Sequence, residues 1–292
     1  MPVASCQCWL PACDYDLAAT LTSGQAFRWQ PQDDGWTGVV AGRWVQLTSR
    51  PDGILARTAT LQTDWRWLAD YLRVEENLAA VLESFPDDEP MRAAVAACRG
   101  LRLLRQEPWE CLASFILSST KQIVQIQQIV ALVCECFGEP LPVPEGVALA
   151  FAFPSPQRLA AVTEADLRAC KMGFRAPYLL ATARRVASTA LDLAGLSSLS
   201  LESARAELMS CPGVGRKIAD CVLLFAGGFP QAFPVDVWIM KALQQLYFSR
   251  RRASRRRLEK FTATHFGPHA GYAQQYLFHY MRTKQSASSP KS

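Results

Sequence analysis

The chain has 292 residues, of which half are apolar and one fifth are charged, as in ordinary globular proteins. No apolar run approaches the ~20 residues that a membrane span needs, which excludes a membrane protein. The formal net charge is +5, but residues 201–292 hold 14 Lys and Arg against 5 Asp and Glu, and the rest of the chain is acidic. This asymmetry favours a polyanionic partner at the basic end, although a solvated cluster of charges gives the same count.

Ten cysteines are present, none of them in a Cys-x-x-Cys pair, and the chain has only three histidines. Most cysteines from Cys98 onward lie in apolar helical stretches, where free thiols are commonly buried. Cys6, Cys8 and Cys13 lack a fourth nearby ligand, so we expect no metal site. Together with the absence of a signal-peptide pattern, these features predict an intracellular protein, in the cytoplasm if bacterial and in the nucleus if eukaryotic.

The N-terminal third predicts a small sheet domain. Residues 14–60 alternate between apolar and polar positions and are interrupted by Asp-Asp-Gly and Pro-Asp-Gly turns, which is typical of an antiparallel sheet. From residue 63 the period becomes helical, and apolar residues recur at three and four positions in 77–85 and 91–98. We expect these helices to cover one face of the sheet, within an α+β domain over residues 1–100.

The rest of the chain predicts helices. Pro108 suits the first turn of one helix, and a long apolar helix over 121–137 ends before the Pro-rich loop 138–146. Further helices are predicted over 155–162, 164–170, 176–189, 201–210, 216–228, 236–248, 255–266 and 270–282. The predicted fold class is therefore α+β: a small N-terminal antiparallel sheet domain with helices, then a mainly α-helical domain over 101–284. A tail over 285–292 is expected to be disordered.

Residues 201–228 predict a helix, a tight turn and a second helix. Gly213 and Gly215 allow the turn, and the exposed amides that begin the second helix can bind an anion. Lys217 stands in the first turn of this apolar helix, where the helix dipole disfavours a cation, and such an environment favours a nucleophilic amine for imine chemistry. A surface lysine at a helix end would give the same pattern.

Asp236 follows Pro234 and precedes an apolar helix, which is the pattern of an N-cap. A carboxylate held there by backbone amides can stabilise a developing cation or assist proton transfer near a lysine. An ordinary helix cap has the same sequence.

Together, "PGVGRKIADC" and "PVDVW" resemble the helix–hairpin–helix and Gly-Pro-Asp signature of base-excision DNA glycosylases. Within that superfamily the chain resembles the 8-oxoguanine DNA glycosylases of eukaryotic type. Four further blocks carry this resemblance in the right order: "SGQAFRW" (23–29), "CLASFILSS" (111–119), "MGFRAPYL" (172–179) and "GPHAGYAQQYLF" (267–278).

The resemblance implies a bifunctional glycosylase and abasic-site lyase that acts on oxidised purines. Lys217 matches the Schiff-base lysine that attacks the sugar C1′ atom, and Asp236 matches the aspartate that supports this chemistry. Cys221 and Phe278 match the residues that stack on the two sides of the flipped base. Gln274 matches the amide that reads the Watson–Crick edge of the base.

The resemblance also assigns residues that contact the lesion and the DNA. Gly24 matches the glycine whose carbonyl accepts the extra N7 hydrogen of 8-oxoguanine. Phe174 and Arg175 match a wedge aromatic and an arginine that faces the orphaned cytosine, and the turn glycines Gly213 and Gly215 lie where the family contacts the DNA backbone. Taken singly, each has an ordinary explanation as a turn glycine, a core aromatic or a buried small residue.

Three positions depart from the family pattern. Thr120 stands where an asparagine fills the emptied base stack, Gln125 replaces an arginine that contacts the estranged cytosine, and Trp238 replaces a histidine near the lesion phosphate. Because two of these residues bear on the opposite base, we expect a weaker preference for cytosine opposite the lesion.

The expected partner is damaged double-stranded DNA, bound by a monomer without a required cofactor. No cysteine follows Cys221, so the iron–sulfur cluster of one branch of the superfamily is not expected. Backbone carbonyls near 211–216 are a candidate site for a monovalent cation. The arginine-rich run 249–257 is either a solvated face or a contact to DNA phosphates, without a catalytic role.

Three alternatives remain open at this stage. A monofunctional glycosylase for alkylated bases has the same fold but uses an aspartate and water, so Lys217 argues against it. A non-catalytic hairpin module would grip the DNA backbone and needs no base slot. An enzyme that uses a Schiff-base lysine on a substrate other than DNA would not require the basic C-terminal third.

Overall fold

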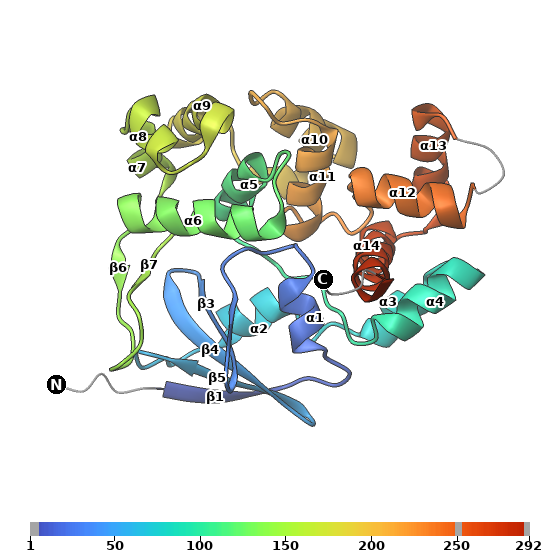
Figure 1. Ribbon diagram of the computed structural model, residues 1–292, viewed down its shortest axis with the longest axis horizontal. Coiled ribbons are helices and arrows are strands. Elements are labelled where there is room, and N and C mark those ends of the chain that lie inside the picture. The colour runs from blue at the N-terminus through green and yellow to red at the C-terminus, as the bar shows by residue number, and fades with distance from the viewer. Residues whose placement is uncertain (1–5, 249–252, 289–292) are drawn as a thin grey trace.

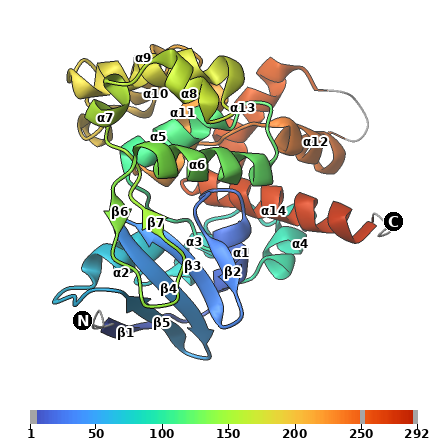
Figure 2. The same cartoon turned by 60° about the vertical axis from the view of Figure 1, so that its left-hand side comes forward.

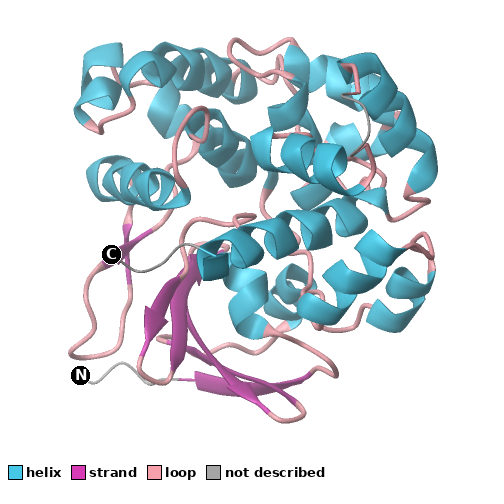
Figure 3. Cartoon of the chain, turned by 45° about the vertical axis from the view of Figure 1, so that its right-hand side comes forward, coloured by secondary structure: helices cyan, strands magenta, loops and turns pink. Residues whose placement is uncertain are grey.

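A five-stranded antiparallel sheet lies beneath a larger group of helices (Figures 1 and 3) in the computed structural model, which describes residues 6–248 and 253–288. The strand order is β1-β5-β4-β3-β2, so the first strand pairs with the last. In this register, Thr58 of β5 is opposite Cys6 on one side and Val45 on the other. The strands are β1 (Cys6–Pro11), β2 (Gln30–Gln32), β3 (Gly35–Val40), β4 (Arg43–Arg50) and β5 (Gly53–Thr58).

Alternating apolar residues give the sheet one buried face. Val45 and Leu47 of β4 are completely buried, as the period of two along a strand requires. Two short helices pack on this face, α1 (Leu17–Thr22) and α2 (Arg66–Leu72). Helix α1 lies inside the segment 14–60 that we expected to be strands and turns, because the Asp16 carboxylate accepts a hydrogen bond from the Ala19 amide and starts a helix there.

The expectation that all the early helices cover the sheet is wrong for two of them. Helices α3 (Leu78–Glu83) and α4 (Glu89–Ala97) pack into the core of the helical part, beside α14 (Figure 1). The buried side chains of Val81, Met91 and Ala94 carry this packing. Spacing alone shows that a helix has an apolar face but leaves open which surface it covers.

The remaining elements form the helical part of the molecule. They are α5 (Pro108–Leu117), α6 (Ile123–Phe137), β6 (Pro140–Leu141), β7 (Ala150–Phe151), α7 (Pro156–Ala160), α8 (Glu164–Ala169), η1 (Gly173–Arg175), α9 (Ala176–Ala187), η2 (Gly195–Ser198), α10 (Leu201–Met209), α11 (Arg216–Phe225), α12 (Val237–Leu246), α13 (Arg255–His265) and α14 (Ala270–Ser288). Among the described residues, no helix is long and apolar enough to cross a membrane.

Two segments differ from the sequence prediction. The Pro-rich loop pairs β6 with β7 as a short hairpin, which extends from α6 toward the sheet (Figure 2). Helix α14 continues to Ser288, four residues into the expected disordered tail, and residues 289–292 lie outside the described part. Of the arginine-rich run, 249–252 also lie outside it, while Ser254 caps α13.

Candidate active site

The hairpin turn between α10 and α11 is packed closely on one side and open on the other. Gly213 has a φ of +76°, and a Cβ atom there would lie 2.4 Å from the ring of Tyr178. Any larger residue at this position is therefore excluded both by backbone strain and by the tyrosine. Gly215, the N-cap of α11, has no neighbour within 4 Å of the equivalent Cβ position, so the turn can be approached closely from outside.

Lys217 lies in the first turn of α11 and points toward α5 rather than into bulk solvent. Its Nζ atom lies 3.4 Å from the Oγ atom of Ser118 and 5.0 Å from the ring centre of Phe115. Ser118 is buried, and Phe115 stacks on Phe225 with 5.6 Å between ring centres. The amine thus lies beside aromatic rings at the edge of the core, as the apolar sequence of α11 indicated.

Cys221 lies one helical turn after Lys217, on the same face of α11. Its side chain is 3% exposed, and the charge of Lys217 acts on its thiol. Burial raises the pKa of the Cys221 thiol to about 12, although the neighbouring lysine opposes this rise. The thiol is therefore protonated at neutral pH, which suits a small neutral surface beside the amine better than a second nucleophile.

Asp236 approaches the same amine from the start of α12. Its Oδ1 atom accepts a hydrogen bond of 2.8 Å from the Ile239 amide, so the predicted N-cap is confirmed. Burial raises the pKa of Asp236, while the hydrogen bond from Ile239 and the charge of Lys217 act in the opposite direction. The Cys221 thiol and the Asp236 carboxyl, both with raised pKa values, thus interact with Lys217.

Gly24 lies on the other side of the site, on the loop after α1. It has a φ of +82°, and a Cβ atom there would lie 2.9 Å from Ile123 and 3.5 Å from the ring of Phe278. The main chain at Gly24 therefore runs directly past the Phe278 ring, with room for no larger residue. This contact joins the sheet domain to α14.

Arg282 is a residue of this site that the sequence analysis did not single out. Its guanidinium lies 5.4 Å from the ring centre of Phe278, and one nitrogen donates to the Thr22 carbonyl at 3.4 Å. Burial lowers the pKa of Arg282, and the carboxylate of Asp236 opposes this shift. The signal in the sequence was its spacing of four residues from Phe278, which places both on one helix face.

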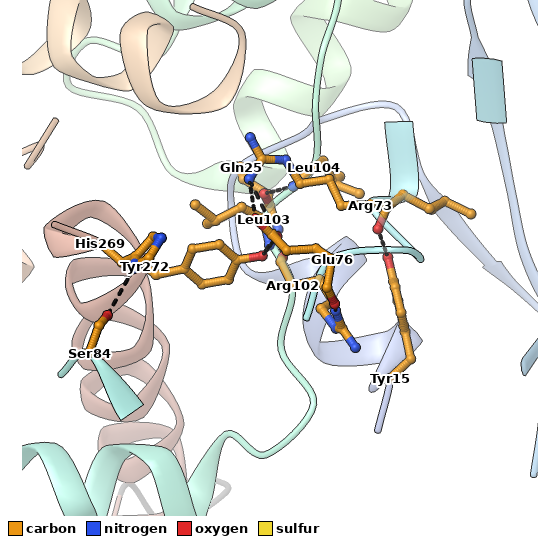
Figure 4. Close-up of polar contacts among 11 residues, drawn as sticks. Tyr15, Gln25, Arg73, Glu76, Ser84, Arg102, Leu103, Leu104, His269 and Tyr272 are labelled. Atoms are coloured by element: carbon orange, nitrogen blue, oxygen red, sulfur yellow. Dashed lines mark hydrogen bonds and ion pairs between the residues drawn. The ribbon is translucent and has the colours of Figure 1, made fainter. Parts of the chain in front are cut away.

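A buried polar framework fixes the loop that carries Gly24 (Figure 4). The Gln25 side chain donates to the Arg102 carbonyl at 2.8 Å and accepts from the Leu104 amide at 2.8 Å. From α14, Gln275 donates to the Ser23 carbonyl at 3.0 Å. Because both glutamines are 2% exposed or less, these bonds are shielded from water and hold the loop in one conformation.

The same framework extends to the first turn of α14. The Tyr272 hydroxyl accepts from the Leu103 amide at 3.2 Å and bonds the Glu76 carboxylate. His269 hydrogen-bonds Ser84 at 2.8 Å, which ties the start of α14 to the end of α3. Figure 4 shows the Tyr272 and Gln25 contacts at neighbouring residues, Leu103 and Leu104, of the loop between α4 and α5. Helix α14, which supplies Phe278, is thereby fixed to the same segment as the Gly24 loop.

Gln274, next to Gln275 on α14, has a polar atom without a partner. It is 4% exposed, and its Oε1 atom is buried with no hydrogen bond to the residues that the structure describes. Buried side-chain oxygens are rarely left unpaired in folded proteins. The amide is therefore available to hydrogen-bond a ligand.

A second group of predicted residues surrounds the end of α5. Thr120 has a φ of +57°, and its Oγ1 atom accepts a hydrogen bond of 2.7 Å from Arg175. Arg175 is 2% exposed, also donates to the Ser119 carbonyl, and lies 4.2 Å from the ring centre of Phe174. Burial lowers the pKa of Arg175. Phe174 itself is 52% exposed, so the aromatic ring and not the guanidinium faces outward.

Two of the departures from the family pattern occupy other roles in this structure. The side-chain oxygen of Gln125 accepts a hydrogen bond of 3.2 Å from the Gln122 amide and caps α6. Trp238 is half-buried in the first turn of α12, two residues after Asp236. In the described part of the chain, no cluster of three or more His, Cys, Asp or Glu could hold a metal ion.

Comparison with known proteins identifies the family. Residues 9–112 match the family model of the 8-oxoguanine DNA glycosylase N-terminal domain, and residues 113–267 match that of the HhH-GPD superfamily base excision DNA repair proteins. The chain is 30% identical to the N-glycosylase/DNA lyase OGG1 of Arabidopsis thaliana, over 90% of this chain and 76% of that protein.

Two solved structures are similar over nearly the whole chain. The structure of MBOgg1 in complex with a low-affinity DNA ligand has a TM-score of 0.90 and 33% identity, with 96% of each chain covered. That of the 8-oxoguanine glycosylase/lyase of Clostridium acetobutylicum, bound to double-stranded DNA with cytosine opposite 8-oxoguanine, has a TM-score of 0.87 and 29% identity. It covers 95% of this chain and 98% of that one. The chain therefore belongs to the HhH-GPD superfamily of base excision DNA repair proteins and, within it, to the 8-oxoguanine DNA glycosylases.

Proposed function

We propose that this protein excises 8-oxoguanine from duplex DNA through a lysine Schiff base and then nicks the abasic strand by β-elimination. The observation that carries the proposal is the environment of Lys217. Its amine lies against Ser118 and Phe115 at the edge of the core and interacts with both Cys221 and Asp236. A merely solvated helix-end lysine would have none of these neighbours.

The chemistry follows from this arrangement. Once it has lost a proton, the Lys217 amine donates its electron pair to the sugar C1′ atom, and the bond from C1′ to the base breaks with its electrons on the base. Asp236, as a carboxylate, stabilises the positive charge that develops on the sugar. Opening of the ring gives an imine between Lys217 and C1′, and loss of a C2′ proton then expels the 3′ phosphate.

In this proposal the slot for the flipped base lies between Cys221 and Phe278. Cys221 would contact one face of the purine and Phe278 the other. Gln274 would bond its Watson–Crick edge, which fits the unpartnered buried Oε1 atom. The Gly24 carbonyl would accept the N7 hydrogen that distinguishes 8-oxoguanine from guanine. Recognition of an extruded base by stacking and edge contacts is the general logic of such enzymes.

The residues around the end of α5 would contact the strand opposite the lesion. The exposed Phe174 ring is suited to enter the base stack as a wedge, and Arg175, through its bonds to Ser119 and Thr120, fixes the loop beside it. Trp238 would lie near the phosphates of the lesion strand. The amides of the turn at Gly213 and Gly215 would approach the DNA backbone.

A monovalent cation at the hairpin is part of the same proposal. The cation would be held by carbonyls of residues 211–216, of which those of Cys211 and Gly215 also accept hydrogen bonds from the Val214 and Ala219 amides. A cation there would help to neutralise a DNA phosphate. We expect DNA affinity to be higher in potassium than in an equal concentration of choline, and equal affinity in both would contradict this part of the proposal.

Borohydride trapping tests the proposed chemistry. In the presence of borohydride and a duplex with one 8-oxoguanine, the wild type should form a covalent protein–DNA adduct, because reduction converts the imine into a stable amine. Lys217→Gln should form none and should lose base release by on the order of 10⁴-fold. Lys241→Gln, which changes an exposed lysine on α12, should leave both unchanged.

Other outcomes identify the alternatives. Release of the base without an adduct in the wild type would indicate a monofunctional glycosylase. Binding of the duplex with neither adduct nor base release would indicate a non-catalytic DNA-binding protein.

A further inference from the structure

Two cysteines lie near one another where the end of α6 packs beside the end of α8, away from the candidate active site. Cys136 lies in the last turn of α6, and the sulfur of Cys170, the C-cap of α8, lies 3.9 Å from the Leu132 carbonyl, one turn before Cys136. Both are free thiols, and they differ in accessibility: Cys136 is exposed, and Cys170 is 1% exposed.

Backbone carbonyls of both α6 and α8 contact the Cys170 sulfur. The Cys170 sulfur lies 3.9 Å from the Leu132 carbonyl of α6 and 3.9 Å from the Asp166 carbonyl of α8. In an α-helix the Leu132 carbonyl is the acceptor for the Cys136 amide, so the Cys170 sulfur contacts the same turn that carries Cys136. The Cys170 sulfur therefore lies beside the turn of α6 that carries the Cys136 side chain.

The environments of the two thiols differ in a way that sets the order of any reaction. Burial raises the pKa of Cys170 to about 12, and the neighbouring Cys136 contributes to this rise. Cys170 is therefore a protonated thiol at neutral pH, and Cys136 is the one that meets an oxidant in solution. An exposed thiol beside a second, resolving thiol is the usual arrangement of an oxidation-sensitive pair.

We propose that Cys136 and Cys170 form a disulfide in the folded protein when it meets a hydroperoxide. The Cys136 sulfur attacks a peroxide oxygen and becomes a sulfenic acid, with release of one water. The Cys170 sulfur then attacks the Cys136 sulfur, its proton leaves with the hydroxyl group as a second water, and the S–S bond closes. Two thiols are oxidised by two electrons and one hydrogen peroxide is reduced to two waters.

This disulfide would tie α6 to the segment that carries the exposed aromatic ring. Lys171 and Gly173 both have a φ of +60°, so the chain turns twice between Cys170 and Phe174. A covalent bond at Cys170 anchors one end of this turn to α6. It also restricts the unfolded chain, which stabilises the folded state when the native geometry accommodates the bond.

Peptide mapping of the full-length protein tests the proposal. After treatment of the folded protein with hydrogen peroxide, alkylation and digestion without reductant, we expect a linked Cys136–Cys170 peptide that disappears on reduction. The oxidised wild type should melt about 5 °C above the reduced form. Cys136→Ser should abolish both the linked peptide and the rise in melting temperature, whereas Cys13→Ser, which removes another exposed thiol, should retain both.

Two results would overturn the inference. One is conversion of Cys136 to a sulfinic or sulfonic acid with no linked peptide, which would mean that Cys170 does not reach it. The other is a linked peptide found only when the oxidation is carried out on protein unfolded in urea, which would mean that the folded structure does not form the bond.

Discussion

The two sides of the candidate site are built differently. On the side of Gly24 and Phe278, the contacts are buried and fixed by hydrogen bonds between the sheet domain and α14. On the side of Thr120 and Phe174, the side chains lie on exposed loops, and Thr120 is bound to a neighbouring arginine. Residues on such loops can change with little effect on the fold. Under the proposed function, the residues that would recognise the lesion are therefore constrained by the core, whereas those that would read the opposite base are free to diverge.

Among the variants that test the two sides of the site, Asp236→Asn should lose the most activity. Asparagine also caps helices, so the hydrogen bond from Ile239 and the melting temperature should be retained. Excision of 8-oxoguanine should fall by about 10³-fold, since the charge that stabilises the developing cation is lost. Single-turnover rates and thermal melting of both proteins check this, and a variant that melts normally but excises at the wild-type rate would remove Asp236 from the mechanism.

The pH profile of the wild type gives a second test of the same residue. Burial raises the pKa of Asp236, and the ionised form is the one that supports the reaction. The excision rate should therefore fall as the pH is lowered through this raised pKa, beginning at a higher pH than for an ordinary aspartate. In Asp236→Asn this acidic limb of the profile should be absent, and a limb of the same position in the variant would assign it to another group.

Loosening of the buried framework should have the next largest effect. Gln275→Met keeps the size of the side chain but removes the donor to the Ser23 carbonyl, so the Gly24 loop is less firmly held. We expect excision of 8-oxoguanine to fall by about 10²-fold. Nicking of a preformed abasic site, which needs no base in the slot, should stay near the wild-type rate. An equal loss in both assays would show that the residue supports the fold and not the loop alone.

Truncation of one wall of the base slot should cost less. Phe278→Leu keeps an apolar surface beside Gly24 but removes the aromatic face, and stacking of a base on an aromatic ring contributes roughly 1–3 kcal/mol. We expect about a tenfold loss in kcat/KM for 8-oxoguanine and no change in nicking of a preformed abasic site. His279→Leu, at the next position of α14, is the matched control for disturbance of the helix. A loss in His279→Leu as large as in Phe278→Leu would mean that the effect comes from the helix.

The sequence predicts some parts of the candidate site and of the fold better than others. The local structure around Lys217 and Asp236 was predictable because a turn, a helix period and an N-cap are local patterns, whereas the chemical roles of Lys217, Cys221 and Asp236 come from the resemblance to the family and stay predictions. The contacts of Gln275 with Ser23 and of Arg282 with Thr22 were not predictable, since these partners lie some 250 residues earlier and the helix spacing places Arg282 only on the face of Phe278. The packing of α3 and α4 on α14 was missed for the same reason, and so was α1, whose only local sign was the capping Asp16.

The smallest expected effect concerns the base opposite the lesion. Each good hydrogen-bonded contact to a base contributes roughly 1–3 kcal/mol of discrimination. The side chain of Thr120 is engaged with Arg175 and that of Gln125 with the N-cap of α6, so neither replaces the family contacts to cytosine. Excision rates of 8-oxoguanine opposite the four bases should therefore lie within about tenfold of one another.

A double variant sharpens this last test. Thr120→Asn combined with Gln125→Arg restores the residue types of the family and should increase the preference for cytosine without raising the rate opposite cytosine itself. A strict preference for cytosine in the wild type would contradict the prediction. It would show that residues outside this pair read the opposite base, such as those of the loop fixed by Arg175. The exposed side of the site would then be as constrained as the buried side.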